Sequence, residues 1–209
     1  MSIAVETFEE PYEPALVADA GPAPKQIVVA YGFWIFLLSD IVMFSALFAS
    51  YAVLVNATDG GPTGAQLFNQ TRVAIETACL LLSSYACGLM SLAIRSQHRL
   101  GTYVGAAITF VLGAAFLELE LQEFASMAAA GATPQRSAFL SAFFTLVGCH
   151  GLHVTIGLLW LVVMMAQVAA RGYRATVVRR LFCFSMFWHT LDIIWVGIFS
   201  VVYLMGSLA

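Results

Sequence analysis

The sequence predicts an all-α membrane protein with five transmembrane helices. Its mean hydropathy is +0.88. Hydrophobic residues make up 61% of the chain and charged residues only 10%, a balance typical of integral membrane proteins. Five apolar stretches each exceed the roughly 20 residues that a helix needs to cross a bilayer, and the sequence lacks the alternating strands of a membrane barrel. The stretches are Tyr31–Val55, Val73–Ile94, Gly101–Met127, Ala138–Ala170 and Leu181–Leu204.

Residues 1–26 precede the first stretch and are rich in acids and prolines. We expect an acidic, disordered tail there, because so few apolar side chains cannot form a core. The tail lacks the basic start and apolar centre of a signal peptide. Residues 27–209 then form one membrane domain. Short polar segments separate its helices at 56–70, 95–100 and 128–136, and a basic hairpin does so at 171–180.

The basic residues predict the orientation of the chain. With the N-terminus in the cytoplasm, seven of the nine Lys and Arg residues lie on the cytoplasmic side. Only Arg72 and Arg136 lie on the other side. By the positive-inside rule, the N-terminus is expected to be cytoplasmic and the C-terminus periplasmic. The cytoplasmic set is Lys25, Arg95, Arg99, Arg171, Arg174, Arg179 and Arg180.

Small residues mark the faces on which helices are expected to approach one another closely. They occur as Gly101-xxx-Gly105 and Ser84-xxx-Gly88, and again as Gly148, Gly151 and Gly157 in the fourth stretch. Tyr203 lies near the end of the last stretch and is expected in an aromatic belt at the membrane surface. The four cysteines have no CxxC spacing and are interpreted as small buried hydrophobic residues.

Ionisable side chains inside the stretches are all acids or histidines. Charge in hydrocarbon is costly, so each of them is expected to have a partner. Helical rise places them in two layers. The inner layer contains Asp40, His189 and Asp192, and the outer layer contains Glu76, Glu118, Glu120, Glu123, His150 and His153.

The spacing within the outer layer predicts a specific pairing. Glu120 and Glu123 share one helix face, as do His150 and His153, because residues three apart are neighbours on a helix. The third and fourth helices are joined by a short loop and should be antiparallel neighbours. We therefore predict hydrogen-bonded carboxylate–imidazole pairs between them, whose disruption would destabilise the protein by several kcal/mol.

Three chemical roles compete with this structural role. Haem ligation by His150 or His153 with His189 is disfavoured, because their estimated depths differ by about 14–18 Å and one iron needs both axial ligands. A di-metal centre is disfavoured because the usual Glu-xx-His motif is absent. A proton relay through the acids would need a titratable bridge between the two layers.

Several distinctive motifs lie within the apolar stretches. The first is YGFWIFLLSD at 31–40, followed by FSALFASY at 44–51. The others are FLSAFF at 139–144, GCHGLH at 148–153, FWHTLDIIW at 187–195 and VYLMG at 202–206. Together these motifs resemble subunit III of bacterial haem–copper terminal oxidases, and in particular its quinol-oxidase branch. The similarity covers residues 31–206, and the five-helix arrangement itself resembles that branch.

The resemblance implies a non-catalytic subunit in the bacterial inner membrane, without cofactor or metal of its own. Haems and copper would be in subunit I, and the partners would be subunits I and II, a small subunit IV and phospholipids. The complex would oxidise quinol, reduce oxygen and translocate protons in aerobic respiration. Interhelical or lipid-linked roles are then expected for Asp40, Glu76, Glu120, Glu123, His150, His153, His189 and Asp192.

Three other functions stay open from the sequence. The chain is compatible with subunit III of a bacterial cytochrome c oxidase, which shares the family's motifs. It is also compatible with a free-standing haem-b membrane anchor, or with a small proton-coupled transporter.

Overall fold

The computed structural model describes residues 25–61, 64, 69–204 and 206 of the chain. Within them, five helices are long and apolar enough to cross a membrane, and no strand occurs in this part of the chain. The predicted all-α, five-helix class is therefore confirmed. The helices are α1 (Lys25–Leu54), α3 (Gln70–Arg95), α4 (Arg99–Ala129), α5 (Ala138–Arg171) and α6 (Ala175–Ile198), and a π-helical segment, η2 (Phe199–Leu204), continues α6.

Local capping explains where three of the helices begin. The side chain of Asn69 accepts hydrogen bonds from two backbone N–H groups at the start of α3. The His98 imidazole accepts one from Gly101 at the start of α4, and Ser137 accepts one from Leu140 at the start of α5. Each cap satisfies N–H groups that the first turn of a helix leaves without a partner.

Two helices begin well before the predicted apolar stretches. Helix α1 already begins at Lys25, so the last two residues of the predicted tail are helical, and residues 1–24 lie outside the described residues. Helix α6 begins at Ala175, and the predicted basic hairpin contracts to the turn after Arg171. Gly172 at φ +64° makes this tight turn possible. Arg179 and Arg180 can then be helical, because arginine is a good helix former.

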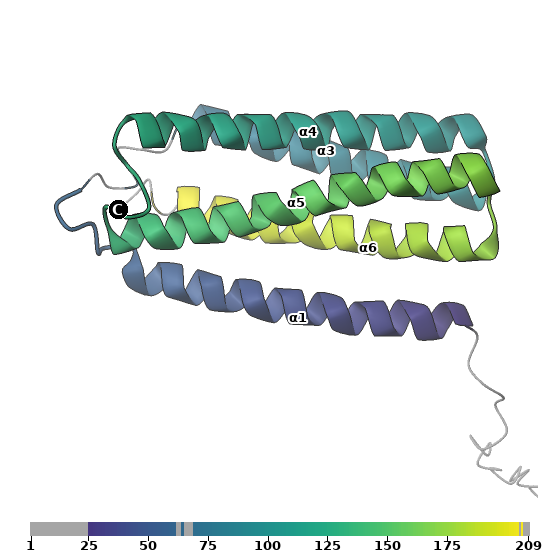
Figure 1. The fold of residues 1–209 in the computed structure, drawn as a ribbon, viewed down its shortest axis with the longest axis horizontal. Helices are drawn as coiled ribbons and strands as arrows, with labels where there is room; N and C mark the ends of the chain where they lie inside the picture. Colours follow the sequence, from purple (N-terminus) through teal and green to yellow (C-terminus); the bar gives the residue numbers. More distant parts are fainter. Residues whose placement is uncertain (1–24, 62–63, 65–68, 205, 207–209) are drawn as a thin grey trace, which may run out of the picture.

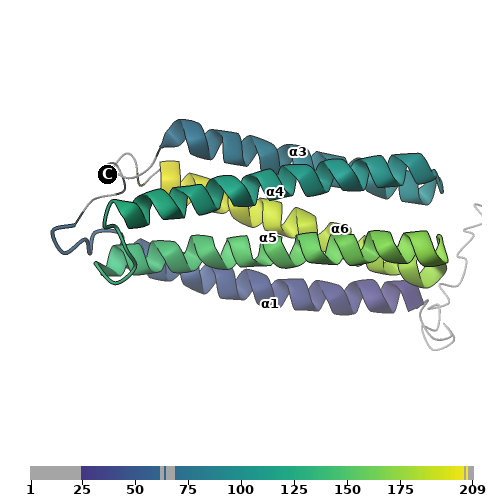
Figure 2. The ribbon, with the colours of Figure 1, turned by 45° about the horizontal axis from the view of Figure 1, so that its top comes forward.

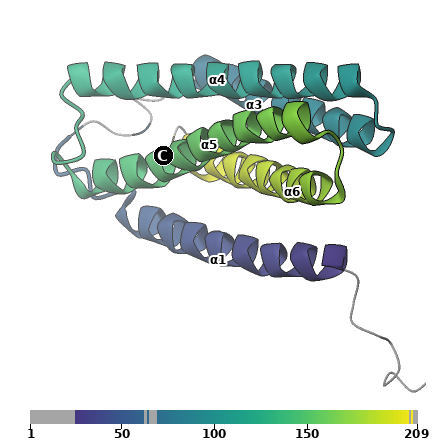
Figure 3. The same ribbon diagram turned by 45° about the vertical axis from the view of Figure 1, so that its right-hand side comes forward.

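The helices form an antiparallel bundle with α6 near its centre. Helix α6 packs against α1, α3 and α5, while α4 packs against α3 and α5 (Figure 2). Figure 1 shows α3 and α4 on one side of the bundle and α1 on the other. Figure 3 shows α5 inclined to α4. We call the end at which α1 begins the proximal end, and the end at which it terminates the distal end.

Glycine permits several of the closest helix contacts. A Cβ atom added to Gly105 of α4 would lie 2.9 Å from Cβ and 3.1 Å from Cα of Met90 in α3. A Cβ added to Gly157 of α5 would lie 2.8 Å from the Trp188 ring of α6. Gly88, by contrast, has open space beside it. The Gly101-xxx-Gly105 motif is thus a packing face as predicted, whereas Gly88 is not.

Candidate functional site

Three carboxyl groups are buried together in the distal half of the bundle. Glu76 of α3 and Glu120 and Glu123 of α4 are each at most 3% exposed. They lie close enough for their charges to act on one another. Neither oxygen of Glu76 or Glu120 has a hydrogen-bond partner among the described residues, whereas Glu123 accepts a hydrogen bond of 3.0 Å from the Tyr203 hydroxyl. We call these three residues the carboxyl cluster.

The predicted carboxylate–imidazole pairing is wrong. His150 Nε2 lies 3.2 Å from the carbonyl oxygen of Leu191, and His153 Nδ1 lies 2.7 Å from the carbonyl oxygen of Cys149 in its own helix. Glu120 instead packs on the backbone of Gly151, where an added Cβ would lie 2.8 Å from both carboxyl oxygens. The missing side chain of Gly151 admits the carboxyl group between the two helices.

Aromatic rings surround the buried His150. Its ring centroid is 5.1 Å from that of Trp195, 5.7 Å from Phe116 and 6.4 Å from Phe44. His153 lies further toward α1, with its centroid 5.3 Å from that of Phe44. The predicted outer layer therefore divides into the carboxyl cluster and a histidine–aromatic region, and Glu118 lies outside both on the exposed face of α4.

The predicted inner layer also divides. His189 of α6 lies with Nδ1 2.7 Å from the Ser84 hydroxyl of α3. Asp192, one turn further along α6, is close enough to His189 for their charges to interact. Asp40 of α1 is instead close enough to Cys149 of α5 for its charge to act on that thiol. The predicted separation into two layers is wrong for the histidines, because His150 of the outer layer meets the carbonyl of Leu191, next to Asp192 of the inner layer.

Tryptophan and hydroxyl side chains supply the interhelical hydrogen bonds that the prediction assigned to acids and histidines. Trp188 of α6 donates from Nε1 to the Ser83 hydroxyl of α3 at 3.1 Å, and Ser83 donates to the Thr109 carbonyl of α4 at 3.1 Å. Trp195 donates to Thr77 of α3 at 3.1 Å. Polar groups of this kind commonly connect membrane helices. Tryptophan within a span, paired with serine or threonine in another, was the sequence signal for these contacts.

The π-helical segment η2 closes the distal end of the bundle. The Tyr51 hydroxyl of α1 donates to the Val202 carbonyl at 3.4 Å, and Tyr203 reaches Glu123 of α4. Tyr203 is 1% exposed. Its predicted place in a membrane-surface aromatic belt is therefore wrong, because its hydroxyl serves the carboxyl cluster instead.

Glu120 gives a direct test of the corrected geometry. Since neither of its oxygens has a hydrogen-bond partner in the part of the chain that the structure describes, Glu120→Gln should leave the free energy of unfolding unchanged or raise it. The new amide N–H groups can donate to the neighbouring carboxyl groups, and the shape is conserved. Denaturant titration in mixed micelles measures the change. A loss above about 2 kcal/mol would indicate a hydrogen-bonded carboxylate at this position.

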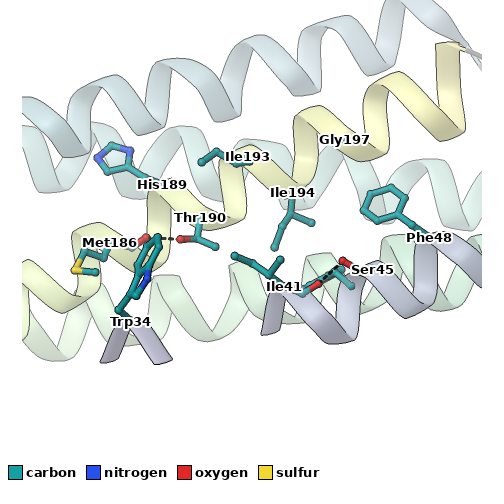
Figure 4. A pocket seen from close by; sticks show the side chains of 11 residues that line it. Trp34, Ile41, Ser45, Phe48, Met186, His189, Thr190, Ile193, Ile194 and Gly197 are labelled. Carbon is teal, nitrogen blue, oxygen red and sulfur yellow. Dashed lines mark hydrogen bonds between the residues drawn. The ribbon is translucent and has the colours of Figure 1, made fainter. Parts of the chain in front are cut away.

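An apolar cavity of about 480 Å³ lies between α1 and α6. Ile41 and Phe48 contribute from α1, and Ile193 and Ile194 contribute from α6 (Figure 4). His189 also borders this cavity, which we call the α1–α6 groove. Among the described residues, no three His, Cys, Asp or Glu side chains gather closely enough to hold a metal ion.

Comparison with known proteins identifies the family of this chain. Residues 19–207 match the family described as cytochrome c oxidase subunit III. The chain belongs to this family. Subunit III relatives include the cytochrome bo(3) ubiquinol oxidase subunit 3 of Pseudomonas aeruginosa, which is 51% identical over 178 residues, or 85% of each chain. The corresponding Pseudomonas putida protein is 47% identical over 177 residues, covering 85% of this chain and 86% of the relative.

A more distant relative is also named as subunit 3 of a quinol oxidase. The quinol oxidase subunit 3 of Bacillus subtilis is 43% identical over 175 residues, which are 84% of this chain and 86% of the relative. The resemblance to subunit III of haem–copper quinol oxidases is therefore confirmed.

Proposed function

We propose that this chain is the non-catalytic subunit III of a haem–copper quinol:oxygen oxidoreductase. In this role it stabilises the catalytic subunit I, binds phospholipid and carries no cofactor of its own. Haems and copper are assigned to subunit I, and subunit II and a small subunit IV complete the complex. The observation that carries the proposal is the 51% identity to a ubiquinol oxidase subunit 3 over 85% of the chain.

The arrangement of arginines supports a membrane orientation. Arg95 and Arg99 flank the proximal turn between α3 and α4, and Arg171 and Arg174 flank the turn between α5 and α6. We assign the proximal end to the cytoplasm and the distal end to the periplasm of a bacterial inner membrane.

The α1–α6 groove supports lipid binding. Its lining is almost entirely apolar, and it runs along two adjacent membrane-spanning helices. This shape and chemistry fit a lipid acyl chain. The aliphatic side chains that line it would supply dispersion contacts along the chain.

Purification of the native complex tests the proposed function. A tag on this chain should recover haem-containing subunits and an activity that oxidises quinol in preference to cytochrome c, because the relatives are quinol oxidase subunits. The measurements are subunit identification, visible spectrum and oxygen uptake. Preferential oxidation of cytochrome c would place the chain in the other branch of the family, and a haem bound stoichiometrically to the isolated chain would contradict the cofactor-free role.

Deletion of the chain tests whether it stabilises subunit I during turnover. If the chain stabilises the catalytic subunit, the remaining complex should keep its initial rate of quinol oxidation and lose activity faster during turnover. Oxygen uptake recorded from the first seconds to exhaustion of substrate measures both the initial rate and the later loss of activity. An unchanged lifetime would contradict the stabilising role.

A further inference from the structure

Glu118 differs from the other outer-layer acids because it lies on the exposed face of α4. Its Oε1 accepts a hydrogen bond of 2.9 Å from the amide of Gln122, one turn further along the helix. No partner for Oε2 occurs among the described residues. A neutral amide on the same helix does not balance the charge of a carboxylate, so Glu118 has no cation beside it among the described residues.

Glu118 is too deep for water to solvate it freely. It precedes the distal end of α4 at Ala129 by eleven residues, or about 16 Å of helix. Helix α4 has 31 residues, about 46 Å, and so exceeds a ~30 Å hydrocarbon core by about 8 Å at each end when centred. The carboxyl group is then about 8 Å inside the core. Side chains of this kind almost always face other protein or a water-filled cavity rather than lipid.

The surroundings of Glu118 favour contact with another helix. Several exposed residues of α4 lie along one stripe of the helix, because they are three, four or seven positions apart. They are Ala107, Val111, Glu118, Leu121 and Ala125. Val111 is 63% exposed and Leu121 is 62% exposed. A stripe of this kind, which begins and ends with alanine, suits close packing of a second membrane helix.

The proximal part of this stripe borders a groove of about 300 Å³ between α4 and α5. Ala107 and Val111 line it from α4, and Val162 and Met165 line it from α5. On α4, this apolar groove is thus followed toward the distal end by the carboxyl group of Glu118. We call the stripe and the groove together the α4 face.

We infer that the α4 face binds a transmembrane helix of a partner oxidase subunit, and that this helix presents a basic side chain to Glu118. The inference rests on the proposed function, because it requires a complex. Apolar side chains of the partner occupy the groove, and alanines of α4 allow the backbones to approach. An arginine or lysine at the depth of Glu118 supplies a cation, which the described part of this chain does not, and donates to Oε2.

Site-specific crosslinking in the native complex tests the surface. The photoreactive residue p-benzoylphenylalanine replaces Val111 or Leu121 in the tagged chain, and the complex is irradiated in membranes before purification. Covalent adducts with another oxidase subunit are expected at both positions, and the crosslinked peptide should belong to a membrane span that contains Arg or Lys. Absence of protein adducts at both positions, in a chain that still co-purifies with haem, overturns the inference.

Glu118→Gln tests the charge separately. This variant conserves the shape and the contact to Gln122, so its helical content by circular dichroism serves as the folding control. Loss of one interhelical polar contact should lower the partner subunit retained per tagged chain in detergent by about threefold. Unchanged retention overturns the assignment of a basic partner. If even the unmodified chain recovers no haem-containing subunit, the proposed function fails instead.

Discussion

Replacing Trp188 with alanine should destabilise the protein by about 3–5 kcal/mol, the range measured for large aromatic residues removed from a packed core. Trp188 is 1% exposed and fills the space that two glycines leave. Cβ atoms added to Gly113 of α4 and Gly157 of α5 would lie 3.0 Å and 2.8 Å from its ring. Three helices therefore lose packing together, and Ser83 loses the hydrogen bond from the indole nitrogen.

Trp188→Phe is the matched variant for this prediction. It conserves most of the ring packing but removes the N–H donor to Ser83, a type of contact that averages about 0.6 kcal/mol between membrane helices. We expect a much smaller loss than for alanine. Unfolding can be followed through reaction of the buried thiol of Cys87 with a fluorescent reagent. Equal losses for the two variants would show that the hydrogen bond, rather than ring packing, dominates.

Gly105→Ala should destabilise the hairpin of α3 and α4 by about 1–3 kcal/mol, as overpacking of a filled core does. The new methyl group would meet backbone atoms of Met90 at 3.1 and 3.2 Å. Backbone cannot rotate away as a side chain can, so the two helices must separate. Thermal unfolding in detergent, followed by circular dichroism, measures the effect.

Gly88→Ala provides the control within the same helix pair. Nothing lies within 4 Å of the methyl group that it would add. Alanine has a higher helix propensity than glycine by up to about 1 kcal/mol, so this variant should be neutral or stabilising. A loss at Gly88 equal to that at Gly105 would contradict the explanation by steric contact.

The sequence predicted the five helices well because each apolar stretch is long enough to be unambiguous. It predicted depth less well, because α1 and α6 begin before the residues from which depth was counted. Rotation of each helix about its axis was harder to predict, because the spans are apolar on nearly every side. Glu118 and Glu120 are two residues apart and were assigned to one layer, yet Glu120 packs on Gly151 and Glu118 faces outward.

The predicted carboxylate–imidazole pairs were wrong for a related reason. Similar depth on neighbouring helices suggested Glu120 or Glu123 with His150 or His153. Glu120 instead meets the Gly151 backbone, and His150 meets the Leu191 carbonyl. Backbone carbonyls and glycine surfaces are present in every helix and so leave no distinctive pattern in a sequence. Side-chain pairs such as Trp188 and Ser83 were in principle visible, since both residue types are conspicuous within apolar spans.

The placement of α1 has a consequence for biogenesis. Helix α1 is synthesised first, yet its main contacts are with α5 and α6, which leave the ribosome last. Until translation nears completion, α1 must wait in the lipid beside the translocon without its native neighbours. Insertion and tertiary assembly of this chain are thus separated in time, and a nascent chain that ends before α5 leaves its first helix without either of these neighbours.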